Sequence, residues 1–477
     1  MLGMKNQIAI ALLAMLVTAV TMPTHAQTFS QLYNFGTKSG DALNPQGAIA
    51  QGLDGDLYST SNTGGAHNWG SVFKVTPEGK EIVLYSFCSQ TDCTDGNSPY
   101  GGLTLRPDGH FLGTTEYNGV GVANSAGTIF DVSPTGTLTT LHTFTGPDGA
   151  APISPPIEGP DGSFYGVTPS GGAASNCGTL YRMTDAGFTL LYEFDHPGAG
   201  NGCNPNGPLV LGSDGSLYGT TESGGLNGPG TVFRATLNPG KATTVTFLSQ
   251  RPDAFVGPPN NLIQGNDGNF YGMYGSFLFQ MTPIGTFNVL ATLPIQLGQA
   301  VVGLGQASDG NFYETVSGRS GSIDGVLYQV TPAGSDSVIA GFGNNCNAFG
   351  SCPFVAEYPS SPPMQGTNGL LYGSTSGGGT GTGCNGGCGV FYSWDNNLPP
   401  FVKTVQLMGP VGSSVEILGQ GFNSSTTVSF NGTAAEVNLQ SATSLCTKVP
   451  AGATTGLVTV TTSSGPLTSN TNFIVTP

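Results

Sequence analysis

Short apolar runs alternate with turn residues in a fixed order along residues 29–398. One copy reads "PLVLGSDGSLYGTTESGG" at residues 208–225, followed by "GTVFRAT" at residues 230–236. We read it as strand A, an Asp-Gly turn, strand B, a glycine-rich loop and strand C. Glycine after aspartate supplies the positive φ that a tight hairpin needs, so this pattern predicts antiparallel strands.

The turn glycine recurs with a period near fifty residues. Its positions are Gly55, Gly109, Gly162, Gly215, Gly268, Gly310 and Gly369. A second turn, such as "PEG" at residues 77–79, leads into a fourth strand D, such as "VLYSF" at residues 83–87. Repeats of this length made of strands indicate propeller blades rather than a helical solenoid. Because no long segment has helical periodicity, the predicted fold class is all-β.

The two ends of the repeat region complete each other. The segment "LYNF" at residues 32–35 reads as a D strand that lacks its own A, B and C strands. The seventh repeat ends after its C strand, "GVFYSW" at residues 389–394. The N-terminal strand is therefore predicted to close the last blade and cover an open sheet edge. We predict a seven-bladed β-propeller over residues 27–398.

The period breaks after the linker "NNLPPF" at residues 396–401, which predicts a second domain over residues 399–477. Short stretches there alternate apolar and polar residues between glycine turns, as in "TTVSFNGTAAEV" at residues 426–437. Some seven short strands in about eighty residues favour an immunoglobulin-like sandwich.

Both parts resemble known families. The repeats resemble the GloVer tandem repeats of "choice-of-anchor" secreted bacterial proteins, in a DG-x-[FL]-YG-T-[TS] pattern that covers about residues 29–398. Blade 6 departs from the pattern at Glu314, where the other repeats mostly have glycine. The C-terminal domain resembles an IPT/TIG domain in "GQGF", "VSFNG" and "VPAGATTG". This resemblance implies a spacer or a binding module in a secreted protein.

The first 26 residues read as a targeting segment. Lys5 precedes an apolar run over residues 8–20, and small residues follow at 24–26. This pattern predicts a secretory signal peptide that is cleaved before Gln27. No later apolar run is long enough to span a bilayer. We therefore expect a protein in the periplasm, at the cell surface or secreted, without a membrane span.

The charge balance changes which partners are plausible. Charged residues make up 8% of the chain, and 12 Lys and Arg stand against 28 Asp and Glu, for a net charge of −16. Affinity for a nucleic-acid backbone depends on cationic side chains, so nucleic acid is excluded as a partner. No phosphate-binding or metalloprotease motif occurs, and the prediction is a monomer with no cofactor and no metal.

Eight of the nine cysteines lie on loops of one face. The B–C and D–A loops share an end of the strands, which we call the long-loop face. We predict the disulfides Cys88–Cys93 and Cys177–Cys203, because export permits oxidation. For the last four, Cys346–Cys352 with Cys384–Cys388 is preferred, and crossed pairing stays open. A zinc site is the rival hypothesis. Cys446, in the C-terminal domain, is expected to be a buried apolar side chain.

Candidate catalytic residues on this face are Glu116, Glu222, His67 and His196. Glu116 and Glu222 hold matching positions at the start of the B–C loops of blades 2 and 4. A carboxylate pair is the apparatus of a glycosidase, and a histidine beside a glutamate suits acid–base chemistry. The competing interpretation is that all four are solvated loop residues, and no catalytic set is assigned.

Aromatic residues give the stronger indication of binding. Trp69 and Tyr117 lie in B–C loops, Tyr274 lies beside one, and His67 is two residues from Trp69. Exposed rings can stack on sugar rings. The predicted function is non-enzymatic binding of a glycan or another extracellular polymer on the long-loop face. The alternatives are a polysaccharide hydrolase or lyase that uses the loop carboxylates, and a purely structural cell-surface protein.

Overall fold

The computed structural model describes residues 27–119, 126–195, 201–225, 230–238, 242–249, 259–296, 299–320, 323–343 and 356–477. Within these ranges the chain is all-β, as predicted, apart from one 3₁₀ turn, η1 (Thr91–Cys93). The described residues contain no helix of the length and apolarity that crossing a membrane requires. The predicted signal peptide lies outside these ranges.

Residues 28–395 form seven antiparallel sheets, each with four strands in a row and some with a short fifth strand. We interpret each sheet as one blade of the propeller and number the blades along the chain. Blades 1 to 3 contain β2 (Ala42–Pro45), β3 (Ala50–Gln51), β4 (Leu57–Gly64), β5 (Ser71–Val75) and β6 (Glu81–Ser86); β7 (Thr104–Leu105), β8 (Phe111–Thr115), β9 (Thr128–Val132) and β10 (Leu138–Thr143); and β11 (Ile157–Glu158), β12 (Phe164–Thr168), β13 (Thr179–Thr184) and β14 (Gly187–Glu193).

The next three blades repeat this order. They contain β15 (Gly202–Pro205), β16 (Val210–Leu211), β17 (Leu217–Gly224), β18 (Thr231–Thr236) and β19 (Thr244–Ser249); β20 (Pro259–Gln264), β21 (Phe270–Tyr274), β22 (Phe277–Met281) and β23 (Phe287–Thr292); and β24 (Ala300–Gln306), β25 (Phe312–Ser320), β26 (Ile323–Val330) and β27 (Asp336–Phe342). Strands that follow one another in the sequence pair within each blade, so the same turn motif recurs in every blade.

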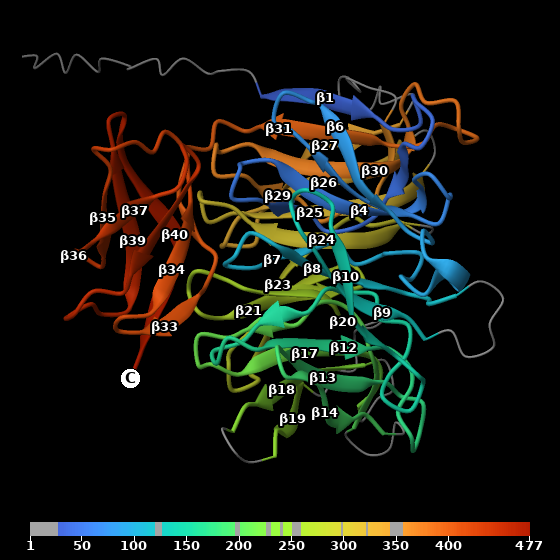
Figure 1. The fold of residues 1–477 in the computed structure, drawn as a ribbon, viewed down its shortest axis with the longest axis horizontal. Coiled ribbons are helices and arrows are strands. Elements are labelled where there is room, and N and C mark those ends of the chain that lie inside the picture. The colour runs from blue at the N-terminus through green and yellow to red at the C-terminus, as the bar shows by residue number, and fades with distance from the viewer. Residues whose placement is uncertain are drawn as a thin grey trace, which may run out of the picture.

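Blade 7 joins the two ends of the propeller. It contains β28 (Ala356–Pro359), β29 (Met364–Gln365), β30 (Leu371–Gly378), β31 (Val390–Asp395) and, from the N-terminus, β1 (Thr28–Asn34). β1 runs antiparallel to β31, and Figure 1 shows the two side by side. The Phe29 ring stacks on Tyr392 with 4.7 Å between centroids, and buried Phe35 contacts Phe73 of blade 1 at 5.2 Å. β1 and the phenylalanine that follows it therefore pack against the last blade and the first.

The Asp-Gly turn is tied to strand B by a tyrosine. In blades 1, 4 and 5 the tyrosine hydroxyl donates to the turn aspartate four residues earlier, over 2.7 Å from Tyr58, 3.0 Å from Tyr218 and 2.7 Å from Tyr271. Blades 3 and 6 make the same bond. The aspartate also accepts the backbone N–H two residues later, which closes the turn. The repeated phrase therefore encodes a turn and its anchor.

Buried hydroxyl pairs hold strands B and C together where the B–C loops begin. Oγ1 of Thr115 lies 2.8 Å from Oγ1 of Thr128, and the same pair recurs in blades 1, 3 and 4. Paired hydroxyls satisfy each other away from water, which avoids the cost of an unpaired buried polar group. These pairs give the loops of the long-loop face a fixed base.

A second packing rule explains the glycine in the middle of strand B. A Cβ on Gly113 would lie 2.3 Å from the Phe130 ring, and one on Gly219 would lie 2.5 Å from the Phe233 ring, both from the paired C strand. The aromatic ring therefore needs the space that glycine leaves. Blade 6 breaks this rule, because fully buried Glu314 occupies the position opposite Tyr328.

Residues 403–476 form two facing sheets of an immunoglobulin-like sandwich. One contains β32 (Lys403–Thr404), β34 (Ser414–Leu418), β38 (Ser444–Lys448) and β37 (Val437–Leu439); the other contains β33 (Met408–Pro410), β40 (Gly465–Thr476), β39 (Gly456–Thr462), β35 (Thr427–Phe430) and β36 (Thr433–Ala435). Ile417, Phe430 and Val458 are among the buried side chains of the core between them.

Cys446 does not lie in that core, which corrects the prediction for this residue. Its thiol is half-buried beside Glu416, the residue opposite on β34. Burial and the bond to Glu416 raise the pKa of the Cys446 thiol to about 11. The prediction failed because strand alternation in a half-buried sheet places this side chain on the polar face.

The sandwich docks on the end of the propeller that carries the A–B turns (Figure 1). The Phe401 N–H donates to the Thr367 carbonyl over 3.0 Å, and Gln420 Nε2 donates to Thr367 Oγ1 over 2.9 Å. Thr443 Oγ1 donates to the Leu53 carbonyl over 2.8 Å. Because the A–B turns lie at the other end of the strands, this docking leaves the long-loop face uncovered by the sandwich.

Candidate functional site

Three disulfides brace the long-loop face. Cys88–Cys93, Cys177–Cys203 and Cys384–Cys388 form among the described residues, in the predicted pairs. Cys177 and Cys203 join the B–C loop of blade 3 to the start of blade 4, so this bond links two blades. Cys346 and Cys352 lie outside the described residues, and their pairing stays a prediction.

Loss of the inter-blade disulfide is expected to destabilise the propeller. The double variant Cys177→Ala/Cys203→Ala opens a loop with a sequence separation of 26. A loop of this length is expected to cost about 3 to 4 kcal/mol in the free energy of unfolding, because the unfolded chain gains freedom. Urea unfolding measures the change, with Cys446→Ala as the cysteine control. A midpoint equal to that of the unaltered protein would show that the bond contributes nothing.

Three exposed aromatic rings lie on neighbouring loops of this face. Trp69, Tyr100 and Tyr117 keep 38%, 39% and 40% of their surface exposed. They are the aromatic residues among the exposed large hydrophobic side chains of the described chain. We call these three residues the aromatic platform. Trp69 comes from the β4–β5 loop, Tyr100 from the β6–β7 connection and Tyr117 from the loop after β8.

Backbone hydrogen bonds place the platform residues together. The Ser98 N–H donates to the Trp69 carbonyl over 3.0 Å, and the Glu116 N–H donates to the Ser98 carbonyl over 3.1 Å. Asn97 and Tyr117 form a two-way antiparallel bridge. The segment Asn97–Ser98 therefore lies between the loops that carry Trp69 and Tyr117. Three loops from two blades form one small surface.

Polar side chains lie at the edge of the platform. The Tyr117 hydroxyl donates to Glu116 Oε1 over 2.6 Å. This bond, more than burial or the nearby Tyr100, raises the pKa of Tyr117 to about 12. Glu116 is thus an acceptor held beside an aromatic ring, and His67 is exposed in the same loop as Trp69. A ring face next to hydrogen-bonding groups suits a ligand with apolar faces and hydroxyl edges.

Tyr274 does not join this surface, and its prediction as a ligand-binding residue is wrong. Its side chain is fully buried, and its ring lies 5.2 Å from that of Phe279. The connection from β21 to β22 is only Gly275 and Ser276, so no loop carries the ring outward. Tyr274 is part of the packing between blades 4 and 5.

The other candidates are dispersed. Glu222 is exposed on β17 in blade 4, whereas Glu116 hydrogen-bonds within its own loop in blade 2. His196 lies outside the described residues. His110 and His142 hydrogen-bond to Asp131 and Asp148 within their own blades. In the described parts of the chain, no group of three or more His, Cys, Asp or Glu side chains could hold a metal ion.

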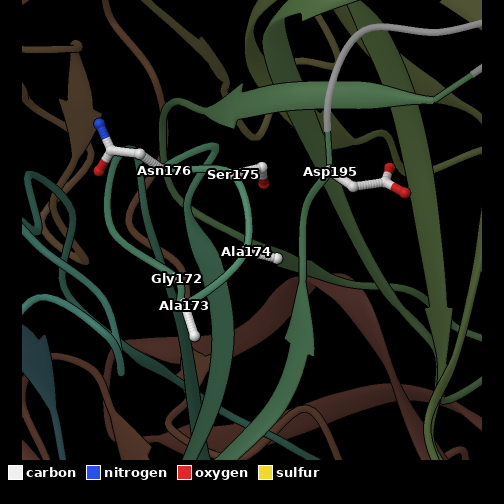
Figure 2. A pocket seen from close by; sticks show the side chains of 6 residues that line it. All are labelled: Gly172, Ala173, Ala174, Ser175, Asn176 and Asp195. Atoms are coloured by element: carbon white, nitrogen blue, oxygen red, sulfur yellow. The ribbon is translucent and has the colours of Figure 1, made fainter.

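A shallow depression occupies the same face beside blade 3. It has a volume of about 610 Å³ and is lined by Gly172–Asn176 and by Asp195. Figure 2 shows that Asn176 and Asp195 point away from each other, with the small Ala174 and Ser175 side chains between them. Asp195 accepts a hydrogen bond from Asn201. The depression therefore presents one carboxylate among small side chains and no convergent chemical groups.

Two family comparisons match this architecture. Residues 17–154 match the Gloeobacter/Verrucomicrobia repeat, and residues 400–475 match the IPT/TIG domain. These matches agree with the two resemblances that the sequence motifs indicate. No curated protein matches the chain.

Solved structures share the fold at low identity. The selenomethionine-substituted virginiamycin B lyase from Staphylococcus aureus has a TM-score of 0.51 at 17% identity, over 77% of this chain and 99% of the lyase. A catalytically inactive form of that lyase with quinupristin has a TM-score of 0.50 at 16% identity and the same coverage. The extracellular domain assigned to a one-component system in B. thetaiotaomicron has a TM-score of 0.51 at 10% identity, over 95% of this chain and 59% of that one. These similarities establish the β-propeller fold.

Proposed function

We propose that the protein is an exported, non-enzymatic surface protein that binds a glycan through the aromatic platform. The exposed rings of Trp69, Tyr100 and Tyr117 on adjoining loops carry this proposal. Sugar rings present C–H faces that pack on aromatic rings, and their hydroxyl groups need polar partners at the edge. Glu116 and His67 supply such partners.

The surroundings of the platform also support binding. The hydroxyl pair Thr115–Thr128 lies at the base of the loop that carries Tyr117. The disulfide Cys88–Cys93 closes the first part of the connection that carries Tyr100. A fixed loop loses little conformational entropy when a ligand binds. Disulfides form in oxidising compartments, which agrees with export through the predicted signal peptide. The C-terminal domain docks on the other end, so the platform remains accessible to a polymer.

Trp69→Ala is expected to weaken glycan binding at least tenfold, because a stacked tryptophan commonly dominates an interface. Affinity electrophoresis of the purified protein in gels that contain soluble polysaccharides measures retention. Released sugar ends are assayed on the same mixtures. Ile284→Ala is the matched control, because Ile284 is 84% exposed on a C–D turn at the opposite end of blade 5.

Each outcome separates the alternatives. Retention without products, lost in Trp69→Ala and kept in Ile284→Ala, supports the proposal. Equal retention of the two variants would move the binding site away from the platform. Products that disappear in Glu116→Gln or Glu222→Gln would establish a polysaccharide hydrolase or lyase. Neither retention nor products across the panel would contradict glycan binding and favour a structural role.

A further inference from the structure

The junction between the propeller and the C-terminal domain contains a large cleft. It has a volume of about 950 Å³, which is within the range of small-molecule sites. The A strands and turns of blades 2 to 5 form one wall, and the first strands of the sandwich form the other. We call it the interdomain cleft. It lies at the opposite end of the propeller from the aromatic platform.

Aliphatic side chains occur on both walls. They include Leu105, Ile157, Leu209 and Ile263 from the propeller and Leu407 and Met408 from the C-terminal domain. Met408 also packs against the core between blades 3 and 4. Leu407 keeps 38% of its surface exposed although it lies at the junction of two domains. The domain contact therefore leaves apolar surface uncovered inside the cleft.

Lys403 provides the positive charge among these walls. It stands on β32, pairs with Leu418 of β34, and lines the cleft. Its side chain is exposed to water. Among the described residues it makes no ion pair and no side-chain hydrogen bond with another group. A ligand that displaces this water leaves the ammonium group without a partner unless the ligand brings an anion.

Glu158 and Asp267 are the carboxylic acids among the residues that line the propeller wall. Glu158 is half-buried on β11, and its Oε2 atom has no hydrogen-bond partner. Burial raises the pKa of Glu158 to about 7, against the opposing effect of Arg106. Glu158 lines the same cleft as Lys403, and the two residues form no ion pair.

We propose that the interdomain cleft binds a small amphipathic molecule, with its apolar body between the aliphatic walls and an anionic group such as a carboxylate at Lys403. The apolar lining favours the body of the ligand by removing hydrocarbon from water. Lys403 selects the anion, because a neutral group there leaves the ammonium without a partner. This site is independent of the glycan-binding platform.

Isothermal titration calorimetry with decanoate and 1-decanol, below the micelle concentration of decanoate, tests the site in the purified protein. Both probes carry the same alkyl chain, and only decanoate is an anion. We expect decanoate to bind at least tenfold more tightly than decanol. In Lys403→Met, which keeps the length and apolar character of the side chain, this preference is expected to fall below twofold. Lys448→Met removes an exposed lysine of the same domain and is expected to keep the preference.

Three results would overturn the proposal. They are no binding of decanoate, equal binding of the two probes, and a preference that survives in Lys403→Met. A thermal melt of each variant confirms folding, so a lost preference in a folded Lys403→Met reports on the charge alone. Loss of the preference in Lys448→Met as well would show a general charge effect and would also contradict the site.

Discussion

Removal of residues 27–36 is expected to destabilise the whole propeller. β1 forms the outer edge of blade 7 through six paired residues, from Thr28 with Asp395 to Asn34 with Val390. Without β1, the buried surface of β31 becomes a bare sheet edge. Phe35, which packs against Phe73 of blade 1, is also lost. Phe35→Ala alone is expected to cost about 3 to 5 kcal/mol of unfolding free energy, as for other buried phenylalanines.

Rescue with a peptide separates loss of the closing strand from a general folding defect. The truncated protein is expected to show a melting temperature lowered by more than 10 °C or to be insoluble. A synthetic peptide of residues 27–38 is expected to restore part of that temperature in proportion to its concentration. A peptide with Phe29→Asp and Phe35→Asp is the control. A truncated protein that melts with the intact one would contradict the role of β1.

Glu314→Gln is expected to change how stability depends on pH. Glu314 is fully buried, and burial raises its pKa well above the ordinary 4.5, although the Gly303 backbone favours its charged form. Below pH 4.5 both the folded and the unfolded chain hold the proton, so no penalty exists. Above pH 4.5 the unfolded state ionises first, and the folded state loses about 1.4 kcal/mol per pH unit until its own pKa is reached.

The measurement is the free energy of unfolding in urea from pH 4.5 to pH 7. The advantage of Glu314→Gln over the unaltered protein is expected to grow steadily across this range. Glu81 and Glu158, whose pKa values burial raises to about 7, act in both proteins and cancel in the difference. Exposed Glu222→Gln is the control. A difference that does not change with pH would show that Glu314 is charged in the folded protein.

The repeats made most of the fold predictable from local chemistry. The Asp-Gly turns and the incomplete first and last repeats can be recognised in short segments of the sequence, and the strands pair as those segments predict. Glu314 was visible in the sequence as a departure from glycine. Its consequence needed the structure, because only the packing shows the aromatic ring that normally covers this position.

The candidate site was less predictable, since it depends on contacts between loops. Trp69 and Tyr117 were identified because they lie in recognisable B–C loops. Tyr274 is the last residue of its strand B, and the connection after it is too short to expose a ring. Tyr100 was missed, because its place beside Tyr117 depends on the bridge between Asn97 and Tyr117. The interdomain cleft needs the docking of two domains, which no local pattern records.

Tryptophan fluorescence tests glycan binding at the platform most directly. The chain has two tryptophans, Trp69 on the platform and Trp394, which is buried in blade 7. In Trp394→Phe, emission therefore reports on Trp69 alone, and it is recorded during titration with oligosaccharides from a polysaccharide that retains the protein. The account predicts a saturable blue shift, as the sugar covers the indole ring, with the affinity found by retention. Saturable binding with unchanged Trp69 emission would contradict it.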